Sequence, residues 1–217
     1  MKTTIGILSK ALIPVLVLII FTGSRKPAKA AEINTSRTTI LADIRGISRI
    51  EVSGNVELLL NQAVKEQVDL YGKRDSRKRN IRFEDGVLQI HSQDEERITV
   101  VVGVNNLQSV DASGKAVVRS LNRLSSIDLD ICLKDHARGS VDAEALNFTA
   151  ILEGSAQMDL TGQAENQTIR MSEASQLEAP EFEAQSRTLT ISDAAVASLG
   201  NTRVKTTAVA GRFAGSF

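Results

Sequence analysis

The sequence predicts an all-β fold: a right-handed parallel β-helix with about 19–20 residues per coil, preceded by a short region of N-terminal strands. The first observation is a recurrence. The last apolar residue before a small, acidic turn falls at Leu133, Leu152, Met171 and Ile191, in steps of 19, 19 and 20 residues. The second is the alternation of apolar and polar residues between these turns, as in IDLDICL and RTLTISD, which is typical of β-strands. One such unit cannot bury its apolar face alone, so we expect the units to stack, with these four residues in one inner column.

Residues 1–30 have the features of a signal peptide. Lys2 and Lys10 precede an apolar run over residues 11–21, and Ala28-Lys29-Ala30 supplies the small-x-small pattern of a cleavage site. Eleven residues span roughly 16 Å as a helix, about half of a bilayer core, so we expect cleavage after Ala30 and no membrane span afterwards. The alternative is that the segment is retained as a membrane tether.

The charge balance argues against a nucleic-acid partner. Five of the 26 Lys and Arg residues lie in residues 1–30 and none of the 26 Asp and Glu residues does, so cleavage leaves a net charge of −5. Binding to nucleic acid needs a basic footprint. Cys132 is the only cysteine, which excludes an internal disulfide bond. We interpret it as a small core-like residue rather than a nucleophile or a dimer link.

The remaining chain divides into three regions. Residues 31–46 lack a pattern and are predicted to be a poorly ordered lead-in. Residues 47–106 contain short alternating segments such as NVELLL and RITVVVGV, bounded by turn signals, and are predicted to be N-terminal strands. Residues 107–217 are predicted to form about five coils. Their first copy is DASGKAVV (111–118), and AVAGRFAGSF (208–217) is a degenerate last copy whose Phe213 and Phe217 would cap the stack.

The small residues have a mechanical explanation at the turns. Where the chain turns sharply and neighbouring units lie directly above one another, Gly154 can adopt a positive φ and Ala and Ser limit the bulk. Ser and Asp side chains can also bond to the local backbone.

The order of these features resembles the putative autotransporter adhesin head GIN domain family, known mainly from exported proteins of Bacteroidetes-like bacteria. Residues 50–58 (IEVSGNVEL) are close to its I-x-V-x-G-x-x-x-V-x-L opening, and residues 85–90 (DGVLQI) match its D-G-x-L-x-I phrase. The resemblance covers residues 47–217. It implies β-helical coils with Ser-Gly-Ser-like turns and a role in adhesion, and it brings no catalytic residues to carry over. The turns at Glu173 and Asp193 depart from the pattern because they lack the glycine.

The turn acids are the sharpest candidates for chemistry. Asp135, Glu153, Glu173 and Asp193 would lie near one edge of the stack, where neighbouring carboxylates could bind Ca²⁺ or act as an acid/base pair. However, the inner columns place Glu153 one position before Glu173 and Asp193, and the G-G-x-G-x-D repeat of calcium-binding folds is absent. We therefore predict a solvated edge, with no metal, no cofactor and no catalytic residue.

Two further groups of residues have competing interpretations. The basic run Lys73–Arg79 could bind an acidic polysaccharide, a lipid phosphate or an acidic protein, but is predicted to be a solvated hairpin loop. Cys132 and His136 are close in sequence, yet a strand followed by a turn gives their side chains no reason to converge. There is no Trp and only one Tyr for stacking against sugars, which disfavours a polysaccharide-active enzyme.

The sequence therefore favours an exported, non-enzymatic, adhesin-like binding or structural module of the bacterial envelope. We expect it in the periplasm or at the cell surface, with a glycan or protein ligand of unknown identity. The alternatives are an envelope carbohydrate-active enzyme on the same fold and a scaffold that binds another protein through its outer strands.

Overall fold

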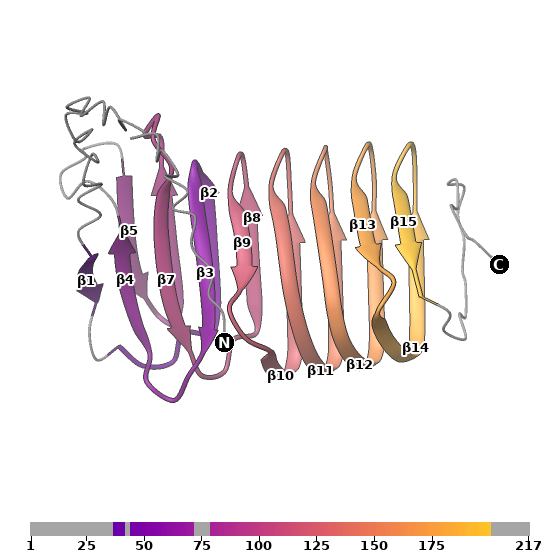
Figure 1. Cartoon of the computed structure of the whole chain (residues 1–217), viewed down its shortest axis with the longest axis horizontal. Coiled ribbons are helices and arrows are strands. Elements are labelled where there is room, and N and C mark those ends of the chain that lie inside the picture. The colour runs from indigo at the N-terminus through magenta and orange to yellow at the C-terminus, as the bar shows by residue number, and fades with distance from the viewer. Residues whose placement is uncertain (1–36, 42–43, 72–78, 201–217) are drawn as a thin grey trace, which may run out of the picture. The chain divides into compact units, whose positions relative to one another are not determined.

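The computed structural model describes residues 37–41, 44–71 and 79–200, all of which are β-strands, turns or loops (Figure 1). The predicted signal peptide, residues 31–36, 42 and 43 of the lead-in, residues 73–78 of the basic run, and both Phe213 and Phe217 lie outside the described residues. No helix long and apolar enough to cross a membrane occurs in the described ranges.

Seven strands precede residue 107. They are β1 (Arg37–Leu41), β2 (Arg49–Gly54), β3 (Val56–Gln62), β4 (Gln67–Tyr71), β5 (Arg79–Glu84), β6 (Val87–Ser92) and β7 (Ile98–Val104). Eight strands follow in the described part of the repeat region. They are β8 (Ser109–Ser113), β9 (Val117–Ser120), β10 (Leu124–Leu133), β11 (Arg138–Leu152), β12 (Gln157–Met171), β13 (Gln176–Ala179), β14 (Phe182–Ile191) and β15 (Val196–Leu199).

The prediction of a right-handed parallel β-helix is wrong. The described strands form one mixed sheet that curves into an open half-barrel, with the order β1-β4-β7-β3-β9-β11-β10-β8-β2-β6-β5 and with β12 to β15 continuing from β11. The pairs β1–β4, β4–β7 and β5–β6 are antiparallel. The difference arises from long-range pairing. Because β2 pairs with β8 and β3 pairs with β9, the N-terminal strands extend the same sheet as the repeats instead of leading into a separate structure.

The repeat spacing itself and its inner column are confirmed. Strands β10, β11, β12 and β14 are parallel, and their registers place Leu133 beside Leu152, Leu152 beside Met171, and Met171 beside Ile191. All four side chains are at most 3% exposed. The steps of 19, 19 and 20 residues therefore correspond to the distance in sequence between paired residues of neighbouring strands in this part of the sheet.

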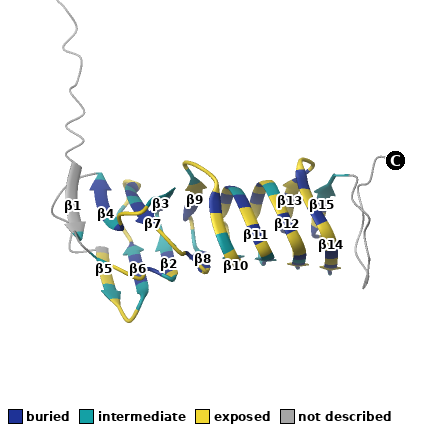
Figure 2. Cartoon of the chain, turned by 90° about the horizontal axis from the view of Figure 1, so that it is seen from below, coloured by how far each residue is buried: buried dark blue, intermediate teal, exposed yellow. Residues whose placement is uncertain are grey.

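The core follows from the alternation along each strand. Buried residues alternate with exposed or half-buried ones along most of β11 and β12, as the bands of Figure 2 show, with one shift of phase at Leu146-Asn147 and at Glu165-Asn166. The buried apolar residues of the N-terminal strands and of the repeats belong to one continuous cluster. Each fully buried Leu or Ile contributes about 1.5–3 kcal/mol relative to exposure, so this cluster is the main source of stability.

Candidate functional site

The turn acids lie along one edge of the repeats, where they take part in the geometry of the turns. Backbone hydrogen bonds align Asp135, Gly154, Glu173 and Asp193 with one another, and all four have a positive φ between 59° and 74°. Glu153 precedes this position, so its predicted offset is confirmed. Asp135, Glu173 and Asp193 occupy the left-handed site of their turns, where glycine, as at Gly154, is the residue of lowest strain.

Two of these carboxylates bond to the backbone of the neighbouring turn. Oδ2 of Asp135 accepts a hydrogen bond from the Gly114 amide at 2.9 Å, and Oδ2 of Asp193 accepts one from the Glu173 amide at 3.3 Å. Glu153 forms an ion pair with Lys134 at 3.3 Å, and this hydrogen bond raises the pKa of Lys134. Within the described residues, no group of three or more His, Cys, Asp or Glu side chains lies close enough to hold a metal ion.

The candidate nucleophile remains separated from a base. Cys132 is half buried on β10, and desolvation raises the pKa of its thiol, an effect opposed by Lys134 and reinforced by Asp111 and Glu153. His136 is exposed in the turn that follows, and no contact is recorded between the two side chains. A thiol whose pKa is raised is a poor nucleophile, because the thiolate is the reactive form.

A serine–histidine contact exists at another place in the sheet. Ser53 and His91 are direct partners in the parallel pair of β2 and β6, and Ser53 Oγ lies 2.7 Å from His91 Nδ1. A catalytic triad also needs a third group that orients the histidine through its other nitrogen. Among the described residues no hydrogen bond from Nε2 of His91 to a carboxylate is recorded, so we interpret the contact as a cross-strand pair.

Arg187 is a buried charge with a packing role. Its side chain is fully buried, and burial lowers the pKa of the guanidinium. Nε donates a hydrogen bond to Oε1 of Gln167 on the neighbouring strand, and Nη2 donates one to the carbonyl oxygen of Phe182 at 3.0 Å. The bond to Gln167 ties β14 to β12, and the bond to Phe182 is made within β14. The ring of Phe182 packs in a tilted pair with that of Phe148, with centroids 5.4 Å apart.

A shallow groove crosses β10, β11, β12 and β14 on the described surface, with a volume of about 670 Å³. We call it the alanine groove, because the registers align Ala145, Ala164 and Ala184 along its floor, next to Ser126. Its walls are exposed polar and acidic side chains together with Leu146, which is 41% exposed. The wall residues are Ser125, Glu144, Gln163, Glu165, Glu183 and Gln185.

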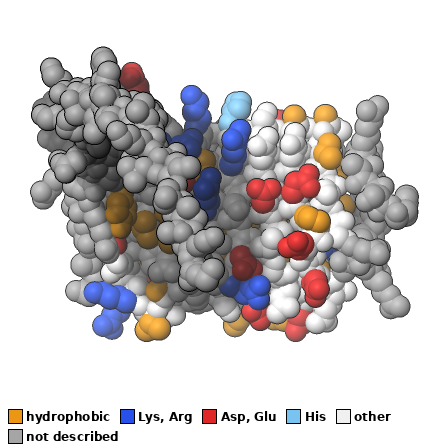
Figure 3. All heavy atoms as spheres, in the orientation of Figure 1, with side chains coloured by type: hydrophobic (Ala, Val, Ile, Leu, Met, Phe, Trp, Pro, Cys, Tyr) orange, Lys and Arg blue, Asp and Glu red, His pale blue; other side chains and the backbone are white. Residues whose placement is uncertain are grey.

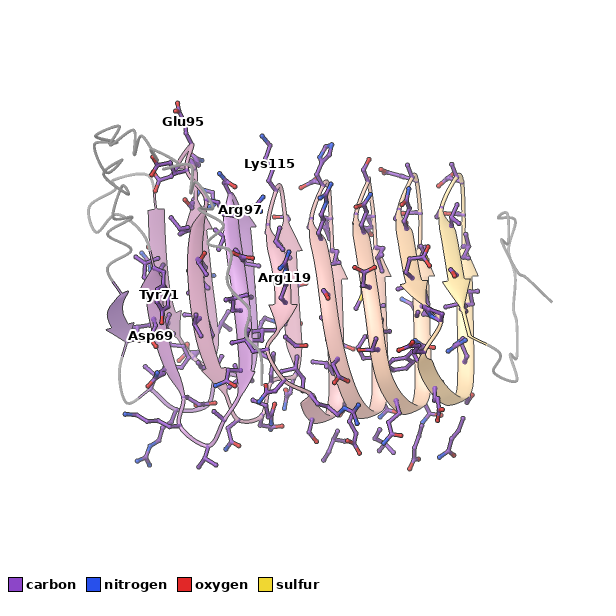
Figure 4. All side chains as sticks on the ribbon, in the orientation of Figure 1. Asp69, Tyr71, Glu95, Arg97, Lys115 and Arg119 are labelled. Carbon is purple, nitrogen blue, oxygen red and sulfur yellow. The ribbon has the colours of Figure 1, made fainter. Side chains whose placement is uncertain are left out.

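A second hollow, of about 330 Å³, lies over β9, β11, β12 and β13. We call it the charged hollow. Arg97, Arg119 and Arg138 line one side, and Asp159 and Glu178 line the other. Figure 3 shows blue side chains on one part of this face and red ones on the neighbouring part, and Figure 4 shows how Arg97 and Arg119 lie on it, with Lys115 at the turn above.

Neither hollow was predicted from the sequence. Arg97 and Arg119 come together because β3 pairs with β7 on one side and with β9 on the other, a connection that no local pattern reveals. The alanine column could have been found, since Ala145, Ala164 and Ala184 follow the same 19–20-residue steps as the inner leucines.

The family model described as "Putative auto-transporter adhesin, head GIN domain" matches residues 47–211. A putative adhesin from Bacteroides fragilis has a similar structure, with a TM-score of 0.63 and 15% identity, over 82% of this chain and 94% of that one. A putative adhesin from Parabacteroides merdae matches over the same shares, with a TM-score of 0.58 and 15% identity.

A third similar structure, described as a putative lipid binding protein, comes from Parabacteroides distasonis. Its TM-score is 0.58 at 12% identity, over 85% of this chain and 96% of that one. No curated protein matches the chain. At these identities the solved structures support the fold alone.

Proposed function

Because this chain belongs to the putative auto-transporter adhesin, head GIN domain family, we propose that it is an exported, non-enzymatic binding module of adhesin type. Residues 1–30 direct its export, and residues 47–217 form the binding domain. It acts in the periplasm or at the cell surface. The descriptions of the similar structures as adhesins support a binding role rather than a catalytic one.

The alanine groove is the observation that carries this proposal. It crosses four neighbouring strands, so that equivalent wall positions recur about every 4.8 Å along it. Its floor consists of small residues, which leaves room for an extended chain above them. The carboxylate and amide groups of the walls can exchange hydrogen bonds with the hydroxyl groups of a glycan or with the backbone of a peptide.

The apolar rim adds contact area at one end of this groove. Leu146 is 41% exposed and Ile127 is 68% exposed, although both are large apolar residues. Exposed apolar side chains beside a polar groove are typical of a surface that contacts a ligand. The ligand class that fits is an uncharged or basic chain, because Glu144, Glu165 and Glu183 would repel an acidic one.

The test is a screen of the purified chain against glycan arrays and against proteins of an envelope extract. We expect binding that is lost in the double variant Gln163→Ala/Glu183→Ala, which truncates two exposed wall residues of the groove. The matched control is Arg170→Ala/Thr190→Ala, which truncates two exposed residues on the same strands, β12 and β14, outside the groove. A ligand that binds the groove variant as tightly as the unchanged chain would contradict the proposal.

A further inference from the structure

Two of the three arginines that line the charged hollow, Arg97 and Arg138, have no ion pair within the described residues. Nε of Arg97 donates to the amide oxygen of Asn55 at 3.2 Å, which carries no charge. Arg119 has only a long contact, 3.8 Å from its Nε to Oε1 of Glu57. Arg138 is exposed, and no ion pair or hydrogen bond of its side chain is recorded within the described residues.

The opposite side of the same hollow holds two carboxylates that repel each other. Asp159 and Glu178 are direct partners in the parallel pair of β12 and β13, so their backbones are about 4.8 Å apart. Like charges at directly paired positions destabilise a sheet. Both side chains are exposed, and no cation of the described residues forms an ion pair with either of them.

The register of the sheet holds Arg119 apart from Asp159, whereas Arg138 on β11 pairs with Gln157 and is a diagonal neighbour of Asp159. Arg119 pairs with Ser140 and Ser140 pairs with Asp159, so the short serine side chain lies between the two charges. Arg119 and Asp159 are therefore separated by two strand spacings, roughly 9–10 Å between backbones. The hollow above Ser140 separates a positive wall from a negative wall.

We propose that the charged hollow binds a zwitterionic group of the phosphoethanolamine type, with the phosphate on the three arginines and the primary ammonium on Asp159 and Glu178. Arginine side chains bind phosphate oxygens through two parallel N–H donors, and the ammonium group offers three donors to the carboxylates. One ligand group thus removes the repulsion within both walls. The proposal does not depend on the alanine groove, which lies over other positions of these strands.

The experiment is a titration of the purified chain with soluble O-phosphoethanolamine, followed by NMR and calorimetry. Phosphocholine, which lacks ammonium donors, and inorganic phosphate, which lacks the cation, serve as matched probes. We expect phosphoethanolamine to bind at least about tenfold more tightly than either probe, since a charge-assisted hydrogen bond is worth about that factor. Arg138→Ser and Asp159→Asn should each weaken binding by a similar factor.

Two control variants and a lipid arm complete this test. Arg170→Ser and Asp130→Asn change exposed charges outside the hollow and should leave the affinity unchanged. Binding to phosphatidylcholine vesicles only when they contain phosphatidylethanolamine would identify a lipid as the source of the group. Binding to the soluble probe alone would identify another phosphoethanolamine-bearing molecule. Equal affinities for phosphoethanolamine and phosphate, no binding to any probe, or no effect of Arg138→Ser and Asp159→Asn would overturn the proposal.

Discussion

At the scale of single residues, the turns show how this chain uses acids at a left-handed position that Gly114 and Gly154 occupy in two of its other turns. Asp135, Glu173 and Asp193 adopt a left-handed conformation that costs a non-glycine residue about 1–2 kcal/mol. For Asp135 and Asp193, a hydrogen bond to the neighbouring backbone offsets part of that cost. For the Glu173 side chain, no such bond is recorded within the described residues, so its strain is the least compensated.

The first prediction concerns this strain. Glu173→Gly should raise the free energy of unfolding by about 1 kcal/mol, because glycine adopts a φ of 59° without the steric cost. The measurement is urea denaturation of the two proteins under identical conditions. Asp135→Gly is the matched variant and should gain less, since it also removes the hydrogen bond to Gly114.

The reverse change checks the same explanation. Gly154→Ala should lower the free energy of unfolding by more than about 1 kcal/mol. The added Cβ would lie 2.9 Å from the carbonyl oxygen of Asp135, and the alanine would have to adopt the left-handed backbone conformation of Gly154. If Gly154→Ala were neutral, or if Glu173→Gly were destabilising, turn strain would be the wrong account of this edge.

At the scale of elements, a buried carboxylate joins segments that are far apart in sequence. Glu66 is 7% exposed and lies between β3 and β4. Its Oε2 accepts hydrogen bonds from the amides of Gly46 and Ile47, and its Oε1 accepts one from the amide of Asn105, just after β7. One side chain therefore fixes the approach to β2 and the exit from β7.

The second prediction concerns this link. Glu66→Ala should lower the free energy of unfolding by about 3 kcal/mol, since backbone amides would be left without an acceptor. Glu66→Gln keeps one acceptor oxygen and should cost less. Glu165→Ala, at an exposed carboxylate of the groove, is the control and should change stability by less than about 0.5 kcal/mol. A neutral Glu66→Ala, measured by urea denaturation, would mean that these bonds do not hold the segments.

At the scale of the whole molecule, the sequence predicted neighbours within the repeats but not the sheet to which they belong. The spacing of Leu133, Leu152 and Met171 identified their column, because residues that recur at a fixed interval become paired neighbours when the repeats stack in register. The pairing of β3 with both β7 and β9 joins residues about 40 to 60 positions apart. Such pairing is decided by the complementarity of whole strand faces, and a local pattern carries no information about the partner.

The candidate site was missed for the same reason. The turn acids were visible as a repeating pattern, and the structure gives two of them backbone bonds instead of a ligand. The arginines of the charged hollow come from β9, β11 and the residue before β7, so their meeting depends entirely on the long-range register. The 19–20-residue spacing could have identified the alanine column. However, the sequence alone does not distinguish small residues at turns from small residues in a groove.

The third prediction is that the N-terminal strands and the repeats unfold in one step, because they share one sheet and one core cluster. The chain supplies two native probes. Tyr71 is the only tyrosine and lies in β4, and Cys132 is the only cysteine and lies in β10. Tyrosine fluorescence and the exposure of the thiol to an alkylating reagent should give the same urea midpoint.

The pH of this measurement matters. Because burial raises the pKa of the Cys132 thiol above its ordinary value, the unfolded chain ionises first as the pH increases. The stabilising effect of keeping this thiol neutral is fully present below the pKa of the unfolded chain and is lost as the pH rises through the pKa of the folded chain. Both measurements should therefore be made near neutral pH. A thiol that becomes reactive well before the fluorescence changes would show that the repeats open independently.

The matching registers of β10, β11, β12 and β14 have a consequence for how such a protein can change over evolutionary time. Each repeat pairs with the next one in the same register as with the previous one, so its two hydrogen-bonding edges are complementary. Strands β11 and β12 pair in this way along nearly their whole length. Duplication of a gene segment encoding one 19-residue unit, such as residues 157–175, would insert a strand layer without disturbing those on either side. The distance between β11 and the last described strand, β15, could then grow in increments of about 4.8 Å, so that the number of repeats would set the length of the sheet.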